Sequence, residues 1–250
     1  MSKKFHLADQ ILFEDEAIIA INKPAGMLVI PDRWNLERPN LLAMLKHRDA
    51  KAKIYVVHRL DQGTSGVVLF AKTASVHQQL NYQLETRQMQ KEYLAIIRGE
   101  VDQKGLIELA IDRDPHRRGR MMVSRGGKPS LTEYQVIERF RGYTYLRLFP
   151  RTGRTHQIRV HLKAIGHPLA IDPLYGTAEP LYLSKLKRDY RFKPDEPERP
   201  LIDRTPLHAA AIQFIHPLTG DQIVLTAALP KDMRAMLHAL RKYQPLLEND

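Results

Sequence analysis

The opening of the chain alternates short apolar runs with polar turns, a pattern typical of strands. ILFEDEAIIAINKP, residues 11–24, holds two such runs around an acidic turn and ends at a proline, which favours a hairpin at the edge of the fold. IYVVHRL and GVVLFAK, residues 54–60 and 66–72, are β-branched runs too short for independent helices. They predict two buried strands joined by a tight connection.

Four segments show helical spacing instead. LLAMLKHRD begins a short helix at Leu41, and ASVHQQLNYQLETR, residues 74–87, places Val76, Leu80 and Leu84 on one face. THQIRVHLKAIG predicts a third helix with an apolar stripe, ended by a glycine and a following proline. DMRAMLHALRKY predicts a closing amphipathic helix.

Strands dominate the rest of the pattern. YLAIIRG, the pair LTEYQVIERF and YTYLRLFP, and the segment 210–227 all predict strands, with turns at Arg141-Gly142 and Thr219-Gly220. Hairpins join most of them, so we expect an α+β fold around a largely antiparallel mixed sheet flanked by helices. We expect one domain over residues 1–250, with its core at about 11–230 and a charged, proline-rich insertion at about 184–206 outside the core.

Composition narrows the class of partner. The 39 Lys and Arg against 28 Asp and Glu give a net charge of +11, which favours a polyanion such as nucleic acid or an anionic membrane surface. No apolar run suits a membrane span, and the N-terminus lacks the apolar stretch of a signal peptide. The chain has no cysteine, which excludes disulfides, thiolate metal sites and cysteine nucleophiles. We therefore expect a cytoplasmic protein that does not bind membranes.

The first candidate for chemistry is Asp61, in HRLDQGTSG, between the two predicted core strands. Polar residues in tight connections commonly satisfy only the backbone. Here two glycines give the loop conformational freedom, Thr64 adds a hydroxyl, and Arg59 adds a cation suited to a phosphate or base. Such a loop allows close approach by a large ligand.

The second candidate is RTGRTHQIRVHL, residues 151–162. His156, Arg159 and Lys163 share one helical face, which is either a solvated basic face or a partner for Asp61. Arg159 lies between Ile158 and Val160, so we expect it near the buried boundary, where an arginine needs a carboxylate.

Several other chemistries fit the sequence poorly. The spacing of His156, His161 and His167 does not suit a metal site. A serine triad lacks its glycine-serine-glycine elbow, and neither a phosphate loop nor a dinucleotide-binding glycine pattern occurs. Tyr93 is either a simple strand aromatic or a ring that stacks on a base. The basic, glycine-containing segment 113–130 predicts a loop or hairpin that is solvated or contacts an RNA backbone.

Taken together, these motifs resemble the RluA-type pseudouridine synthases, in a short form without the N-terminal RNA-binding domain of longer relatives. The resemblance covers about residues 11–230 and rests on the order and spacing of NKPAGMLV, HRLDQGTSGVVLFAKT, KEYLAIIRG, TGRTHQIRVHLKAIGHPLAIDPLYG and PLHAAAIQFIHP. Gln62-Gly63 and Ile171 depart from the usual family pattern and put the local RNA contacts in question. RNA recognition is expected to rest on the catalytic domain itself.

The resemblance implies the pseudouridine synthase fold and a set of site residues. Asp61 would be the catalytic aspartate, Tyr93 the tyrosine beneath the target base, and Arg159 the partner of the aspartate, with Arg154 as second choice. Residues implied to bind RNA or the uridine are His58, Arg59, Thr64, Arg154, His156 and Leu207. Arg59 would help to flip the base, and Leu207 would form the apolar wall of the pocket.

The expected reaction is the isomerisation of specific uridines in structured ribosomal or transfer RNA, with the base flipped out of its stack. It needs no cofactor and no metal, and the aspartate acts either as a nucleophile at the sugar or as a base that forms a glycal. We expect a monomer. The alternatives are a noncatalytic RNA-binding protein that uses the basic surface and a metal-dependent nuclease, for which no convincing ligand set is present.

Overall fold

The computed structural model describes residues 5–32, 35, 37–49, 53–192 and 196–246. Within these ranges the chain forms two compact units. The first comprises residues up to Lys91 together with Ala209–Ala228, and the second comprises Glu92–His208 and the residues from Leu229 onward. The prediction of one catalytic domain over the whole chain stays a prediction.

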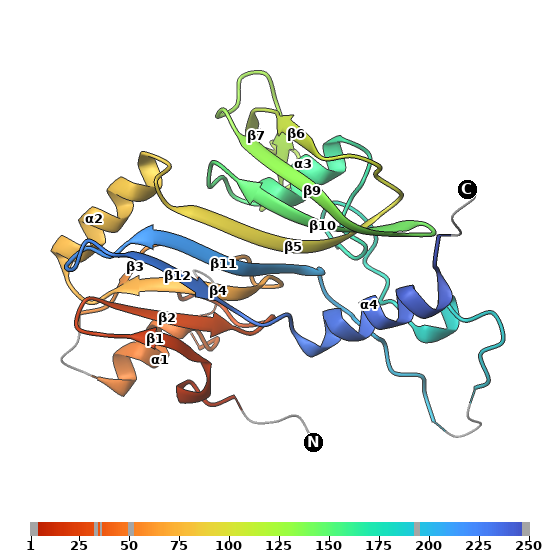
Figure 1. Cartoon of the computed structure of the whole chain (residues 1–250), viewed down its shortest axis with the longest axis horizontal. Helices are drawn as coiled ribbons and strands as arrows, with labels where there is room; N and C mark the ends of the chain where they lie inside the picture. The colour runs from red at the N-terminus through yellow and green to blue at the C-terminus, as the bar shows by residue number, and fades with distance from the viewer. Residues whose placement is uncertain (1–4, 33–34, 36, 50–52, 193–195, 247–250) are drawn as a thin grey trace. The chain divides into compact units, whose positions relative to one another are not determined.

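The first unit is a sheet with the strand order β1-β2-β4-β11 (Figure 1). Strand β3 pairs with β4, and β12 pairs with β11. The elements are β1 (Ile11–Glu14), β2 (Ile18–Lys23), α1 (Leu41–Arg48), β3 (Tyr55–Val56), β4 (Ser65–Ala71), α2 (Ala74–Glu85), β11 (Leu207–Ile215) and β12 (Gln222–Thr226), and a 3-10 turn over Ala8–Gln10 precedes β1. The predicted opening hairpin is confirmed, because β1 and β2 pair antiparallel.

Strand β4 is the most deeply buried strand of the first unit. All seven of its residues are buried, since it lies between two strands and is also covered by α2. Val76 and Leu80 of α2 pack into the same apolar cluster, as their spacing predicts. The first predicted core strand is much shorter than expected: only Tyr55–Val56 is strand, and the chain then leaves the sheet toward Asp61.

The second unit is built on the strand order β5-β10-β9-β6, with a separate hairpin of β7 and β8. Its elements are β5 (Gln90–Arg98), β6 (Gly105–Glu108), β7 (Ile111–Arg113), β8 (Met121–Val123), β9 (Leu131–Phe140), β10 (Tyr143–Pro150), α3 (Gln157–Ala164) and α4 (Lys231–Tyr243), with a 3-10 turn over Leu183–Lys185. Helix α3 packs against β8, β9 and β10. The predicted α+β class and the largely antiparallel sheet are confirmed.

The segment 184–206 corrects one expectation. Its described part is irregular, as predicted, but it is not outside the core. Leu186 and Ile202 are 6% and 2% exposed, and they join the apolar cluster beneath α4. Among its many charged residues, the few apolar residues of this segment attach it to the core. Residues 193–195 lie outside the described part of the chain.

Candidate active site

The loop that carries Asp61 is fastened to the turn after β2. The Gly26 N–H donates to the Gln62 carbonyl at 2.8 Å, and the Gln62 side-chain amide returns a hydrogen bond to the Gly26 carbonyl at 3.1 Å. Within the loop, the Thr64 N–H donates to the Asp61 carbonyl at 3.0 Å. The backbone on both sides of Asp61 therefore has a defined course.

A buried lysine reinforces this attachment. Lys23, at the end of β2, is 0% exposed, and its ammonium donates to three backbone carbonyls. The distances are 3.1 Å to Pro24, 2.9 Å to Met27 and 3.2 Å to Gln62. A buried cation needs such partners, because burial without them costs several kcal/mol. No motif assigned Lys23 a role, although a charged residue at the end of the largely apolar stretch IIAIN was a usable signal.

His58 and Gly66 fix the two ends of the loop. The Nε2 atom of His58 accepts from the Leu69 N–H of β4 at 3.3 Å. Burial, with a smaller contribution from the Lys91 ammonium, lowers the pKa of His58 to about 3, so the imidazole stays neutral. Gly66 has φ +113°, and a Cβ there would lie 2.1 Å from the Ala209 carbonyl oxygen. Only glycine allows this close approach.

The other predicted residues of this loop differ in exposure. Thr64 is 2% exposed and belongs to the interior, whereas Arg59 is exposed. Contacts of His58, Arg59 and Thr64 with RNA stay predictions. The structure adds a backbone role for His58 that its sequence position does not reveal.

In the second unit, Arg159 of α3 forms a buried ion pair with Asp172. Nε donates to Oδ2 at 2.8 Å and Nη2 donates to Oδ1 at 2.7 Å, in a bidentate geometry. Arg159 is 7% exposed and Asp172 is 0% exposed. The expectation that Arg159 lies at the buried boundary beside a carboxylate is confirmed, and that carboxylate is Asp172. Pairing of Arg159 with Asp61 stays a prediction.

Tyr175 connects Arg159 with neighbouring elements. Two guanidinium groups lie over its ring, with the central carbon of Arg159 at 5.1 Å and that of Arg120 at 5.4 Å from the ring centroid. Its hydroxyl accepts from the Met121 N–H at 2.8 Å and hydrogen-bonds to Nδ1 of His156 at 2.8 Å. His156 has φ 54°, an uncommon left-handed conformation for a non-glycine residue.

This network was only partly foreseeable. His156 and Arg159 were named from the helical pattern, whereas Asp172 and Tyr175 were not. Both belong to IDPLYG, the end of the longer motif that carries the family resemblance. An aspartate directly after an apolar run was the available signal.

The remaining predicted residues occupy separate places in the second unit. Tyr93 is 9% exposed on β5, where it pairs with Leu148 of β10. Leu207 is 3% exposed at the first position of β11. Arg154 is exposed, and its guanidinium reaches the Pro129 carbonyl at 3.5 Å. The roles of these residues toward uridine stay predictions.

Among the described residues, no group of three or more His, Cys, Asp or Glu is placed to hold a metal ion. None of the helices in the described ranges combines the length and apolar character that crossing a membrane requires.

Comparison with known proteins places these features in a family. Residues 17–164 match the family described as RNA pseudouridylate synthase. Ribosomal large subunit pseudouridine synthase D of Nitrosomonas europaea is 40% identical over 238 residues, covering 93% of this chain and 65% of that protein. The protein of the same name from Escherichia coli is 36% identical, covering 92% and 70%. The chain thus spans about two thirds of the length of these relatives.

A solved structure gives the same assignment. Human RNA Pseudouridylate Synthase Domain Containing 4 superimposes with a TM-score of 0.68 and 25% sequence identity, covering 94% of each chain. The fold, the matched residues and the order of the motifs agree. The chain therefore belongs to the RNA pseudouridylate synthase family, and to its RluA type.

Proposed function

We propose that this chain isomerises specific uridines in structured RNA, with Asp61 as the catalytic carboxylate. In this reaction the bond between N1 of uracil and C1′ of the sugar breaks, and a bond between C5 and C1′ forms. The proton on C5 leaves to solvent and N1 gains one, so there is no net oxidation or reduction. A carboxylate suits either route, as a nucleophile at C1′ or as a base that forms a glycal.

The observation that carries the proposal is the support of the Asp61 loop. Lys23, Gly26 and Thr64 together hold the backbone of residues 61 and 62. A surface loop that only binds phosphates does not require a buried cation to fix its backbone beside an aspartate. Catalysis does require an accurately positioned carboxylate, because displacement of a reacting group by about 1 Å can lower the rate about 100-fold.

Roles for the other candidates follow from their surroundings. Arg159 would form an ion pair with Asp61 and so orient the carboxylate. Asp172 would hold that guanidinium in one orientation through its bidentate pair. Tyr93 would stack beneath the flipped uracil, with Leu207 as an apolar wall, and Arg59 would assist the flipping, which costs about a few kcal/mol.

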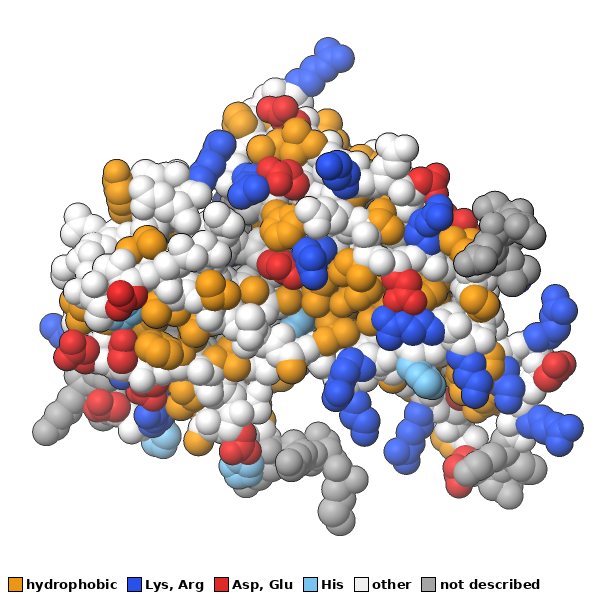
Figure 2. Space-filling model, viewed as in Figure 1, with side chains coloured by type: hydrophobic (Ala, Val, Ile, Leu, Met, Phe, Trp, Pro, Cys, Tyr) orange, Lys and Arg blue, Asp and Glu red, His pale blue; other side chains and the backbone are white. Residues whose placement is uncertain are grey.

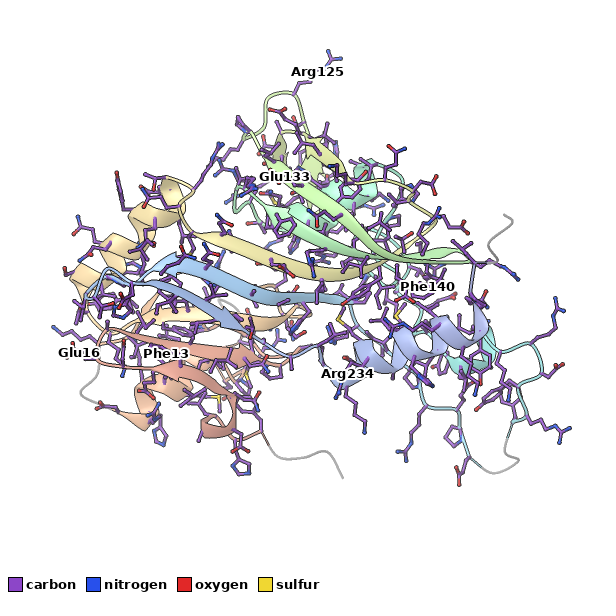
Figure 3. The ribbon with its side chains drawn as sticks, viewed as in Figure 1. Phe13, Glu16, Arg125, Glu133, Phe140 and Arg234 are labelled. Atoms are coloured by element: carbon purple, nitrogen blue, oxygen red, sulfur yellow. The ribbon has the colours of Figure 1, made fainter. Side chains whose placement is uncertain are left out.

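The β7–β8 hairpin supplies cations suited to the RNA backbone. Arg113, the last residue of β7, and Arg117 and Arg118 of the loop are exposed, and Arg125 projects from the turn that follows β8 (Figure 3). The hydrogen bond from the Met121 N–H to Tyr175 attaches this hairpin beside Arg159. RNA held by the hairpin would therefore lie near the proposed partner of the catalytic carboxylate.

The substrate class follows from the relatives. Their names specify the large ribosomal subunit, which favours ribosomal RNA over transfer RNA as the substrate here. We further propose that the chain acts as a monomer in the cytoplasm, and light scattering during gel filtration checks the monomer.

The reaction has a direct assay. RNA labelled with tritium at C5 of uridine releases tritium to water when pseudouridine forms. Wild-type protein should release it from ribosomal RNA of a strain lacking the gene, whereas Asp61→Asn should not. Tight RNA binding by the wild type without any release would favour a noncatalytic RNA-binding protein.

A further inference from the structure

The most exposed side chains of α4 are all basic. Its exposed residues are Lys231, Arg234, His238, Arg241 and Lys242. Four of these lie three or four positions apart, so they line one face over roughly 15 Å. Figure 2 shows Lys and Arg side chains gathered over this helix and the segment beside it, and Figure 3 shows Arg234 pointing outward.

Two acidic groups near this face, Asp232 and Glu138, are already paired. Asp232 accepts both Nε and Nη2 of Arg204, at 2.6 and 2.8 Å. Glu138 pairs with Arg241 at 2.7 Å. Among the residues that the structure describes, no ion pair within 4.0 Å forms for Lys231 or Arg234. These two cations can therefore form ion pairs with an anionic partner.

The segment 185–192 extends the basic surface. Leu186 packs with Met236 and Leu240 of α4 in one apolar cluster, and the Gln244 side chain donates to the Leu186 carbonyl at 3.0 Å. The anchored stretch KLKRDYRF carries four basic residues and one acidic residue. Of the four, Lys185, Arg188 and Arg191 are exposed.

An exposed aromatic pair lies among these cations. Phe192 is 68% exposed, the highest exposure among the large hydrophobic residues of the described chain. Its ring contacts Tyr190 edge to face, with centroids 4.9 Å apart and planes at 80°. Cations interleaved with an exposed ring are typical of single-stranded nucleic-acid sites, where phosphates follow the charges and a base stacks on the ring.

We propose that the basic face of α4 and the segment 185–192 form a binding surface for single-stranded RNA, with Phe192 as a stacking platform for a base. The surface rests on the proposed function in one respect: the RNA bound here is a segment of the substrate other than the reacting uridine. None of its residues belongs to the candidate active site.

A membrane surface fits these observations less well. A basic helix that binds lipid inserts its apolar face into the bilayer. The apolar face of α4 is already used: Met233, Met236, Leu237 and Leu240 are 0 to 3% exposed within the core of the second unit. The helix therefore offers charge to a partner without an apolar surface to insert.

The test measures binding of a fluorescein-labelled 12-nucleotide oligouridine by anisotropy at several salt concentrations. Lys231→Ala/Arg234→Ala should bind about tenfold more weakly at low salt, and the logarithmic salt slope should fall by about 0.7 for each phosphate that the variant no longer neutralises. Phe192→Ala should bind about tenfold more weakly with an unchanged slope, because stacking is not an ionic interaction. The matched control, Lys46→Ala/Lys104→Ala, removes two exposed charges elsewhere and should retain wild-type affinity.

A fluorescence measurement tests stacking at the ring itself. The chain has one tryptophan, Trp34, so a Trp34→Phe/Phe192→Trp variant carries a single reporter. Oligouridine should quench its emission at the same concentrations that raise the anisotropy. Unchanged emission at saturation would overturn the stacking role.

Other outcomes overturn the surface as a whole. Equal affinity of the Lys231→Ala/Arg234→Ala variant and its control would do so. The surface would also be refuted if the Lys231→Ala/Arg234→Ala variant lost binding to vesicles of phosphatidylcholine and phosphatidylserine but bound oligouridine as tightly as the wild type. The tritium-release assay separates the two proposals: if the wild type releases no tritium, the proposed reaction fails, whereas the anisotropy result decides the RNA surface either way.

Discussion

Replacing Asp172 by Asn tests the buried ion pair with Arg159. Asn keeps the shape of the side chain and an oxygen for the N–H groups of Leu174 and Tyr175, which now donate to Oδ1 at 3.0 and 3.2 Å. It removes the negative charge, and its amide places a donor against one of the guanidinium nitrogens. Arg159, only 7% exposed, then becomes a buried cation without this carboxylate.

The expected loss of stability follows from burial. Removing one partner of a buried pair costs about 3–5 kcal/mol, because the remaining charge keeps its desolvation penalty. For a chain of this size, about 1 kcal/mol lowers the melting temperature by roughly 2–4 °C. Asp172→Asn should therefore melt roughly 6–20 °C below the wild type in a circular dichroism scan.

Glu133→Gln is the matched control. Glu133 accepts from Arg151 in the same bidentate geometry, with both distances 2.9 Å, but the two side chains are 39% and 38% exposed. An exposed pair contributes about 0–1 kcal/mol, so this variant should melt within about 4 °C of the wild type. Equal melting temperatures for the two variants would refute the argument from burial.

Three further substitutions test the support of the Asp61 loop. Lys23→Met removes three hydrogen bonds from a buried ammonium and should lower stability by about 3 kcal/mol and the rate of tritium release by about 100-fold; a wild-type melting curve would contradict this role. His58 has its pKa lowered to about 3, so the unfolded chain binds more protons below pH 6.5 and stability falls as the pH falls. In urea titrations, the loss between pH 6.5 and 4.5 should be about 2 kcal/mol smaller in His58→Gln than in wild type, and equal losses would count against a neutral His58. Gly66→Ala places a methyl group 2.1 Å from the Ala209 carbonyl at φ +113° and should cost at least about 2 kcal/mol in the same titrations; a cost below about 0.5 kcal/mol would show that the backbone relaxes.

Periodicity predicted the elements well where burial determines them. A local pattern shows which face of an element packs against the core. The alternation in residues 11–23 therefore predicted the opening hairpin correctly, and the four-residue spacing of Val76 and Leu80 predicted α2. The strand predicted over residues 54–60 failed after Val56. There the polar partners of the loop, and not its β propensity, decide the course of the chain, and those partners are distant in sequence.

Candidate residues for the site could be named from motifs, but the partners of their side chains could not. Asp61, Arg159 and His156 were named as candidates from motifs, whereas Asp172, the carboxylate that pairs with Arg159, was not. Pairing of Arg159 with Asp61 stays a prediction. Lys23 reaches Gln62 across 39 positions of sequence. Such pairings depend on the tertiary structure. A single sequence shows which charged residues are present, but it does not show which residue each of them pairs with.

The most direct test of the proposed function is carbodiimide mapping of pseudouridine in large-subunit ribosomal RNA. RNA from a strain lacking the gene is incubated with wild-type protein or Asp61→Asn, and primer extension then locates each modified site. We predict discrete stops that wild-type protein restores and that Asp61→Asn does not, although both proteins bind the RNA with equal affinity. Restoration of the same stops by Asp61→Asn would contradict the central role of this carboxylate.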